Sequence, residues 1–306
     1  MPGTIHVLTG CTAVGKTELA LRWAEANHAE IVSCDSLLFY RGMNVGTAKP
    51  TSAELARVPH HLVDLCAVTE QMDVTRYVIH ARRAVTDIIA RGRPVLVTGG
   101  SGFYLRAFFG PVADEIEVPD GLRAELRGRL EQEGLASLVA ELQGLNPAGL
   151  GALDARNPRR VLRALERCRA SGRTLAELQA AFAAQPAPFA GYAVELCELV
   201  REKEELDQRI ERRVAAMLQA GLIEEVRGLL AAGLKQNPSA ANAIGYRETI
   251  DFVEGRLPEP ELAGLIAKNT RALVKKQRTW FKTQLPPHPQ VEAGSAGLRG
   301  LFVPQV

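Results

Sequence analysis

The sequence predicts an α/β protein in which a parallel sheet is flanked by helices and interrupted by a helical insertion domain. Short apolar runs alternate with helical periods through about the first 110 residues, as in parallel strands joined by helical crossovers. Strand patterns then stop, and apolar residues recur at helical spacing. We therefore expect a core made of residues 1–115 and 190–306, with residues 116–189 forming the mainly helical insertion.

The core is expected to begin with a strand at residues 5–8 and a helix at residues 16–26. A second helix is expected at residues 75–91, where apolar side chains recur every three to four positions. The remaining apolar runs predict strands at residues 30–34, 61–65, 94–98 and 192–199. A long helical tract follows the last of these strands, and the proline-rich residues 285–289 are expected to begin an irregular tail.

The turn after the first strand carries a phosphate-binding motif. Its residues read GCTAVGKT and fit G-x-x-x-x-G-K-[ST] at every specified position. In such a loop, backbone N–H groups converge on phosphate oxygens, the lysine adds positive charge, and the hydroxyl can bind Mg²⁺. A P-loop NTPase-like core is therefore expected, although a glycine-rich turn with a chance lysine is the alternative. The expected diphosphate-binding residues are Gly10, Cys11, Thr12, Ala13, Val14, Gly15, Lys16 and Thr17, with Thr17 as the Mg²⁺ ligand.

A carboxylate follows the second predicted strand. Nucleotide hydrolases usually place an Mg²⁺-supporting Asp at the end of an apolar strand, but the strand at residues 94–98 is followed by Gly99 and Gly100. Asp35 instead follows the strand at residues 30–34, at the sheet edge where ligands of α/β proteins bind. We expect Asp35 to act as a general base or a metal-shell ligand; the alternative is that it caps a helix or forms a turn.

Composition narrows the cellular setting. The chain has 306 residues, 46% hydrophobic and 24% charged, with a formal net charge of +2, which is ordinary for a globular protein. Its five cysteines lack C-x-x-C spacing, which favours free thiols over a disulfide framework or a zinc site. We find no signal-peptide pattern and no run of eighteen apolar residues, and we expect a cytoplasmic protein that does not bind membranes.

Two basic segments suggest a polyanionic partner. Seven arginines lie between Arg156 and Arg173, against one acidic residue, Glu166. A second group of cations recurs every three or four positions without an intervening acidic residue, which predicts a basic stripe on one helix face. Solvated faces are the alternative for both segments, and membrane-surface binding is a further alternative for the second. The basic stripe consists of Lys268, Arg271, Lys275, Arg278 and Lys282.

Taken together, these motifs resemble the bacterial tRNA dimethylallyltransferases. The block at residues 35–50, D-S-x-x-x-Y-R-G…G-T-A-K-P, is much more specific than the phosphate loop. The resemblance covers nearly the whole chain. The segments that carry it are residues 10–17, 35–50, 59–64, 99–104, 157–160, 244–247 and 270–280.

The resemblance implies a transferase of tRNA processing. Members of the family use Mg²⁺ and transfer a dimethylallyl group from dimethylallyl diphosphate to the exocyclic amine of the adenosine just 3′ of the anticodon. The phosphate loop would then hold an isoprenoid diphosphate in place of ATP, which fits the missing acid after residue 97. By the same resemblance, Asp35 is the base, Arg213 neutralises the leaving diphosphate alongside Lys16, and Ser101 provides a hydroxyl where the family usually has Thr.

The implied partners are dimethylallyl diphosphate and the anticodon stem-loop of tRNA, and a monomer is expected. The basic stripe is expected to contribute to RNA binding. The other expected tRNA-binding residues are Asp35, Ser36, Leu37, Leu38, Ser101, Arg123, Arg159, Arg160, Val161, Leu162, Arg163, Asn242, Ala243, Ile244, Gly245, Tyr246 and Arg247.

Three other functions share some of these features. A P-loop nucleotide kinase would use the same core with ATP as donor, and an isopentenyltransferase acting on a free adenine nucleotide would share the donor. A nucleic-acid-binding adaptor with a degenerate nucleotide fold would not need Lys16, Thr17 and Asp35. The two basic segments favour tRNA as the acceptor over a free nucleotide.

Overall fold

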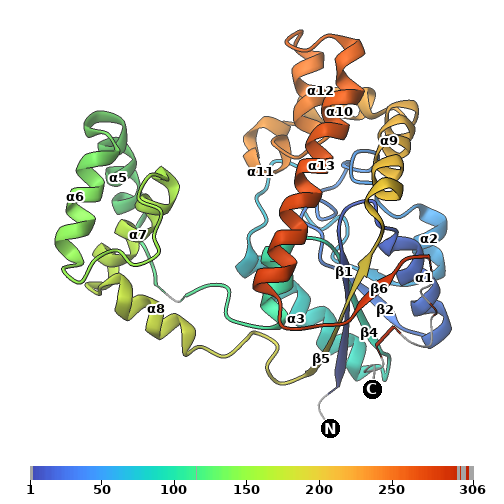
Figure 1. The fold of residues 1–306 in the computed structure, drawn as a ribbon, viewed down its shortest axis with the longest axis horizontal. Coiled ribbons are helices and arrows are strands. Elements are labelled where there is room, and N and C mark those ends of the chain that lie inside the picture. The colour runs from blue at the N-terminus through green and yellow to red at the C-terminus, as the bar shows by residue number, and fades with distance from the viewer. Residues whose placement is uncertain (1–2, 115, 295–296, 298–300, 303–306) are drawn as a thin grey trace. The chain divides into compact units, whose positions relative to one another are not determined.

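The chain folds into two compact units (Figure 1). A computed structural model describes all residues except 1–2, 115, 295–296, 298–300 and 303–306. One unit consists of Met1–Val112 together with Ala187–Val306 and contains the sheet. The other consists of Ala113–Pro186 and contains only helices among its described residues.

The sheet of the first unit has six strands in the described part of the chain, and every strand pair is parallel. The strand order is β3-β2-β4-β1-β5-β6, so the two strands that follow the helical unit extend the sheet beyond β1. This arrangement confirms the predicted parallel α/β fold. The strands are β1 (Thr4–Gly10), β2 (Glu30–Ser33), β3 (His60–His61), β4 (Val95–Thr98), β5 (Ala193–Val200) and β6 (Gln290–Glu292).

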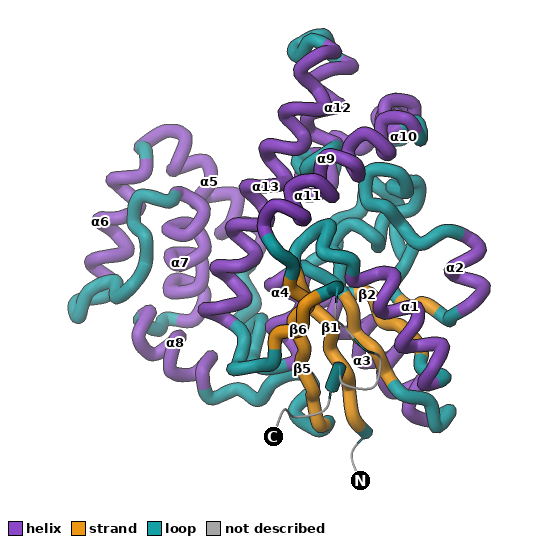
Figure 2. The backbone as a smooth tube through the Cα atoms, turned by 45° about the vertical axis from the view of Figure 1, so that its right-hand side comes forward, coloured by secondary structure: helices purple, strands orange, loops and turns teal. Residues whose placement is uncertain are grey.

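Helices α1 and α3 pack against the strands of the sheet, and α9 packs along the long helix α13. Figure 2 shows the helices after β5 gathered at one end of the sheet. The early helices are α1 (Lys16–Asn27), α2 (Ser52–Arg57), α3 (Val74–Ala90), α4 (Gly102–Leu105) and the 3₁₀ turn η1 (Arg106–Phe108). The later ones are α9 (Lys203–Gln219), α10 (Leu222–Ala231), η2 (Leu234–Gln236), α11 (Pro238–Ala241), α12 (Tyr246–Val253) and α13 (Glu259–Gln284).

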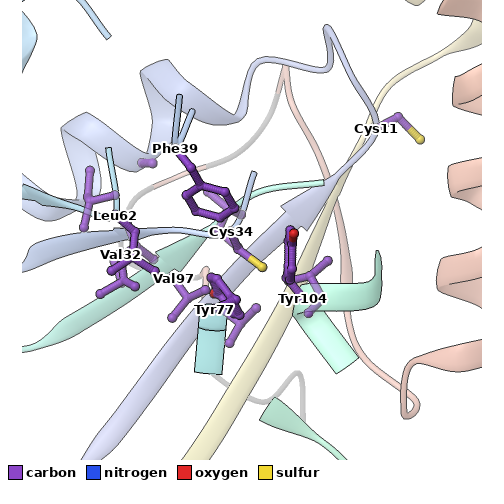
Figure 3. Close-up of a cluster of buried hydrophobic side chains, with 14 of the residues drawn as sticks. Cys11, Val32, Cys34, Phe39, Leu62, Tyr77, Val97 and Tyr104 are labelled. Atoms are coloured by element: carbon purple, nitrogen blue, oxygen red, sulfur yellow. The ribbon is translucent and has the colours of Figure 1, made fainter. Parts of the chain in front are cut away.

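An aromatic cluster supports the carboxyl ends of β2 and β4 (Figure 3). The rings of Phe39, Tyr77 and Tyr104 lie 4.6–5.9 Å apart between centroids. All three side chains are buried, and the Tyr104 hydroxyl donates to the carbonyl of Met72. Because interiors are closely packed, the cluster fixes the segment after β2 and the turn after β4 against the same core.

The structure corrects the expectations for two segments. We expected a strand at residues 61–65, but β3 ends at His61 because Leu62 and Asp64 adopt left-handed backbone angles, with φ of 64° and 55°. Asp64 instead pairs with Lys49, 2.5 Å away, and its N–H donates to Leu38. Conversely, the expected irregular tail contains β6, which pairs with residues 198–200 of β5.

The helical unit has its own small core. Its helices are α5 (Asp120–Glu133), α6 (Leu135–Leu145), α7 (Pro158–Ser171) and α8 (Leu175–Ala183). Leu126, Leu138, Leu142 and Leu165 are fully buried between them. This cluster is separate from the core around the sheet, so the unit buries apolar surface of its own. Among the described residues of both units, we find no helix long and apolar enough to cross a membrane.

Gly99 allows the ends of β2 and β4 to meet. A Cβ atom at this position would lie 2.1 Å from the Cys34 carbonyl oxygen, which is backbone and cannot rotate away. We therefore expect Gly99→Ala to lower the free energy of unfolding by about 2 kcal/mol or more, measured by urea denaturation. Gly264→Ala on α13 is the control, because its Cβ would meet no atom within 4 Å. Ala favours helices over Gly, so this control should be neutral or stabilising by up to about 1 kcal/mol, and equal losses in both variants would contradict the prediction.

Candidate functional site

The phosphate loop connects β1 to α1 and requires unusual backbone angles. Gly10, Ala13 and Gly15 have φ values of 146°, 65° and 108°. At Gly10 a side chain is also excluded, because a Cβ would lie 2.4 Å from the carbonyl oxygen of Leu199 on β5. Glycine at positions 10 and 15 therefore permits the backbone conformation that brings N–H groups together at the start of α1.

Cations hold four carbonyl groups of this loop. Lys16 Nζ donates to the carbonyls of Gly10 and Cys11, at 2.7 and 2.8 Å. From α9 and the segment before it, Arg209 donates to Ala13 at 2.8 Å and Arg201 donates to Val14 at 3.1 Å. A planar trans peptide directs its N–H away from its carbonyl. The cations therefore fix the orientation of these four peptide groups.

Gln277 joins the phosphate loop to the turn after β4. Its Oε1 accepts from the Thr12 N–H at 3.0 Å, and its Nε2 donates to the Gly100 carbonyl at 2.9 Å. The sequence analysis missed this residue, as it missed Arg201 and Arg209. No local pattern identifies them, because each bond spans more than 170 residues.

Burial changes the acidity of two cations at the site. Burial lowers the pKa of Lys16 to about 8, and the nearby Asp35 carboxylate partly opposes this shift. Burial also lowers the pKa of Arg213, again opposed by Asp35. Arg213 reaches the site from α9, and its Nη2 donates to the Thr47 carbonyl at 3.1 Å. Desolvated cations that share one carboxylate form a strong site for an added anion.

Asp35 and Ser101 lie at the ends of β2 and β4. Asp35 is half-buried, and its Oδ1 accepts from the Leu37 N–H at 3.0 Å, so the carboxylate also stabilises the turn that we had considered as the alternative role. The backbone N–H of Ser101 donates to the Cys34 carbonyl at 3.4 Å. The Ser101 side chain makes no capping bond to α4, although the residue precedes that helix.

Two cavities in the first unit meet at these residues. The basic cavity, about 550 Å³, is lined by Lys16, Thr17, Arg209, Arg212 and Arg213 among others. The aromatic cavity, about 410 Å³, is lined by residues that include Ser101, Phe103, Trp280 and Phe281. Thr12, Asp35, Thr47 and Arg213 line both cavities. A group bound in either cavity can therefore approach Asp35.

The segment at residues 44–47 is held in place by a second set of distant residues. Glu225 on α10 accepts from the N–H groups of Asn44, Val45 and Gly46 at 2.7–3.2 Å. The same carboxylate accepts from the Tyr246 hydroxyl at 2.7 Å. A side chain at Gly46 would lie 2.6 Å from the Tyr246 ring, which explains the need for glycine there.

The predicted RNA contacts in the first unit differ in their exposure. Tyr246 is fully buried against Gly46, whereas Ile244 and Gly245 line the aromatic cavity. Asn242 and Arg247 are exposed, and Ala243 is half-buried. Ser36 and Leu37 line the aromatic cavity, and Leu38 lines the basic cavity.

The basic stripe lies on α13, but acidic residues from another helix reach it. Arg271 pairs with Asp207 at 3.3 Å and also with Glu211, both on α9. We had expected the stripe to be without acidic neighbours, because none occurs between Lys268 and Lys282 in the sequence. Arg278 is exposed and donates to the Arg201 carbonyl at 3.0 Å, and Lys268, Lys275 and Lys282 are exposed as well. The exposed charge of the stripe is therefore carried by its three lysines and Arg278.

The remaining predicted RNA contacts lie in the helical unit. Asn157 caps α7 by accepting from the N–H groups of Arg159 and Arg160. These two arginines and Arg163 are exposed, whereas Val161 is buried and Leu162 half-buried. Arg123 on α5 is exposed, 3.4 Å from Asp120. Arg167 and Arg169 pair with Asp114 and Glu125, so part of the arginine cluster is neutralised within the unit.

The described residues contain no group of three or more His, Cys, Asp or Glu side chains placed to hold a metal ion. Mg²⁺ in phosphate sites usually keeps several waters and takes only one or two protein ligands besides the phosphate oxygens. The exposed Thr17, which lines the basic cavity together with Asp35, fits that kind of site.

Comparisons with known proteins match one family over most of the chain. The IPP transferase family model matches residues 38–284. A tRNA dimethylallyltransferase from Opitutus terrae is 68% identical over 289 residues, covering 94% of this chain and 93% of that protein. A tRNA dimethylallyltransferase from Deinococcus radiodurans is 41% identical, covering 97% of this chain and 96% of that protein.

Solved structures agree with these matches. The full-length tRNA isopentenylpyrophosphate transferase from Bacillus halodurans has a TM-score of 0.69 and 31% identity, covering 95% of this chain and 90% of that one. A eukaryotic dimethylallyltransferase acting on tRNA has a TM-score of 0.82 over 95% of this chain and 74% of that one. At 23% identity, this second likeness supports the fold alone.

The lowered pKa of Lys16 predicts that anion binding depends on pH. Lys16 loses its proton above about pH 8 in the free protein, and a bound anion restores the charged form. The affinity for an alkyl diphosphate should therefore fall up to about tenfold per pH unit between pH 8 and 10, measured by calorimetric titration. Lys16→Arg keeps its charge over this range and should remove the dependence. An unchanged wild-type affinity up to pH 10 would contradict the assignment.

Proposed function

The chain belongs to the IPP transferase family, and on this basis we propose that it transfers a dimethylallyl group from dimethylallyl diphosphate to tRNA. The proposed acceptor is the exocyclic amine of the adenosine adjacent to the anticodon on its 3′ side. Relatives that match nearly the full length of the chain are named tRNA dimethylallyltransferases, which argues against a nucleotide kinase.

The observation that carries the proposal is the meeting of the two cavities at Asp35 and Arg213. We assign the diphosphate of the donor to the basic cavity, where Lys16, Arg213 and the N–H groups of the phosphate loop offer positive charge and donors. We assign the adenine to the aromatic cavity, beside Asp35 and Ser101. The donor and acceptor would then meet at the residues shared by both cavities.

In the proposed reaction, the adenine nitrogen bonds to the first carbon of the dimethylallyl group as the bond from that carbon to the diphosphate oxygen breaks. Asp35 accepts the proton that the amine loses. Lys16 and Arg213 stabilise the negative charge that develops on the departing diphosphate. Ser101 is proposed to orient the adenine by its hydroxyl, which is free of a capping bond.

Mg²⁺ is proposed to complete the donor site. Thr17 would hold it by its hydroxyl, together with diphosphate oxygens and waters, as is usual for Mg²⁺ at phosphates. When bound, the ion would neutralise charge on the diphosphate.

The exposed lysines of the basic stripe and the exposed arginines at the start of α7 are proposed to contact the RNA backbone. The protein is also proposed to act as a monomer. The five cysteines are free and buried, which agrees with the reducing cytoplasm as the site of action.

One assay tests the whole proposal. The protein is incubated with Mg²⁺, dimethylallyl diphosphate and unmodified tRNA, and the digested nucleosides are analysed by mass. A dimethylallyl adduct on adenosine supports the proposal. Prenylation of free adenine nucleotides with no product on tRNA would assign the acceptor to the free-nucleotide class.

Asp35→Asn tests the base. The amide keeps the size and polarity of the side chain but cannot accept the proton, so turnover should fall by a factor on the order of 100 or more with tRNA affinity nearly unchanged. Asp87→Asn on the exposed face of α3 is the matched control and should retain wild-type turnover. Wild-type turnover in Asp35→Asn would assign the base to another group.

The stripe is tested by the salt dependence of tRNA binding. Each lysine that contacts phosphate contributes roughly 0.7 to 0.9 to the slope of log affinity against log salt. The double variant Lys275→Gln and Lys282→Gln should therefore flatten the slope by about one to two units. Arg271→Gln is the comparator on the same face: its guanidinium is already paired with Asp207 and Glu211, so the slope should change little. Equal flattening in both variants would show that exposure does not select the contacts.

A further inference from the structure

Phe103 is an exposed aromatic residue at the edge of the aromatic cavity. Its side chain is 68% exposed, whereas none of the other eight phenylalanines is exposed. It lines the same cavity as Asp35 and Ser101. Aromatic side chains are enriched at interfaces, so an exposed ring at the edge of a cavity suits contact with a bound partner.

The local structure holds Phe103 outward. Tyr104 and Leu105, which follow it in α4, are buried in the core. On the other side, Gly102 lies so close to Trp280 that a Cβ there would be 2.5 Å from the indole ring. Because both neighbours are fixed, the short helix cannot rotate to bury Phe103. The side chain of Phe103 therefore stays directed away from the core, beside the cavity.

Cations lie near the ring. Arg106 follows Phe103 by one turn, and its guanidinium reaches Gln284 at the end of α13. Lys276, also on α13, lines the aromatic cavity. An exposed aromatic ring that shares a cavity with one cation and a helical turn with another suits an unstacked nucleobase and its flanking phosphates, because single-stranded RNA binds by stacking and charge together.

We propose that Phe103 stacks against an unpaired base of the RNA substrate, next to the adenosine that enters the aromatic cavity. This inference rests on the proposed function, since it requires an RNA acceptor. A base drawn out of its stack leaves neighbours that have also lost a stacking partner. The phenyl ring would replace that partner and hold the loop open while the adenosine is in the cavity.

The test compares substitutions that separate stacking from simple apolar contact. Phe103→Ala should weaken binding of an unmodified anticodon stem-loop RNA by roughly five- to 150-fold. Phe103→Tyr and Phe103→Trp should remain within about threefold of the wild type, whereas Phe103→Leu should lose most of the affinity. The KM for dimethylallyl diphosphate and the slope of affinity against salt should stay unchanged, because no charge is removed.

Ile79→Ala is the matched control, since Ile79 on α3 is a comparably exposed hydrophobic residue, at 63%, and does not line the cavity. It should bind RNA as the wild type does. Full affinity in Phe103→Leu would show that the ring makes only apolar contact and would overturn the stacking proposal. A raised KM for dimethylallyl diphosphate in Phe103→Ala, with unchanged RNA affinity, would also overturn the proposal, because Phe103 would then line the donor site. If the wild-type protein neither binds nor prenylates the RNA, the proposed function itself fails. In the two outcomes above, by contrast, the wild type is active and only the stacking proposal fails.

Discussion

The orientation of the peptide groups in the phosphate loop is the constraint on which the rest of the site depends. Lys16, Arg201 and Arg209 bind four carbonyl groups of the loop, and Gln277 binds the N–H of Thr12. The arginines come from α9 and the segment before it, and Gln277 comes from α13, so the packing of these two helices sets the shape of the loop. The loop in turn determines where a diphosphate can bind relative to Asp35.

The fold and the central residues of the site were accessible from sequence because their signals are local. A glycine at a left-handed position, a lysine at the start of a helix and an apolar run each carry their meaning within about ten residues. Ligands bind at the carboxyl edge of a parallel sheet, so the position of Asp35 directly after an apolar run predicts that it lies at the site. The family resemblance added Ser101 and Arg213, which no local pattern identifies.

Interactions between distant segments of the chain could not be predicted from the sequence. Glu225 binds the backbone of residues 44–46, and nothing around position 225 distinguishes it from other helical glutamates. The same limit applies to Arg271, whose acidic partners lie on α9, some sixty residues earlier. The strand β6 was missed for a related reason: it is only three residues long, and its pairing with β5 defines it more than its own composition does.

The helical unit interrupts the sheet-containing unit in the chain, and this has a consequence for synthesis on the ribosome. The strand β1 needs β5 on one side, yet β5 begins at Ala193, after the whole helical unit has been made. At typical rates of translation, on the order of ten seconds or more passes between the synthesis of β1 and that of β5, and one edge of β1 stays unpaired during this time. An unpaired apolar strand edge is prone to association with other chains, so the nascent protein has an interval in which chaperone protection would improve its yield.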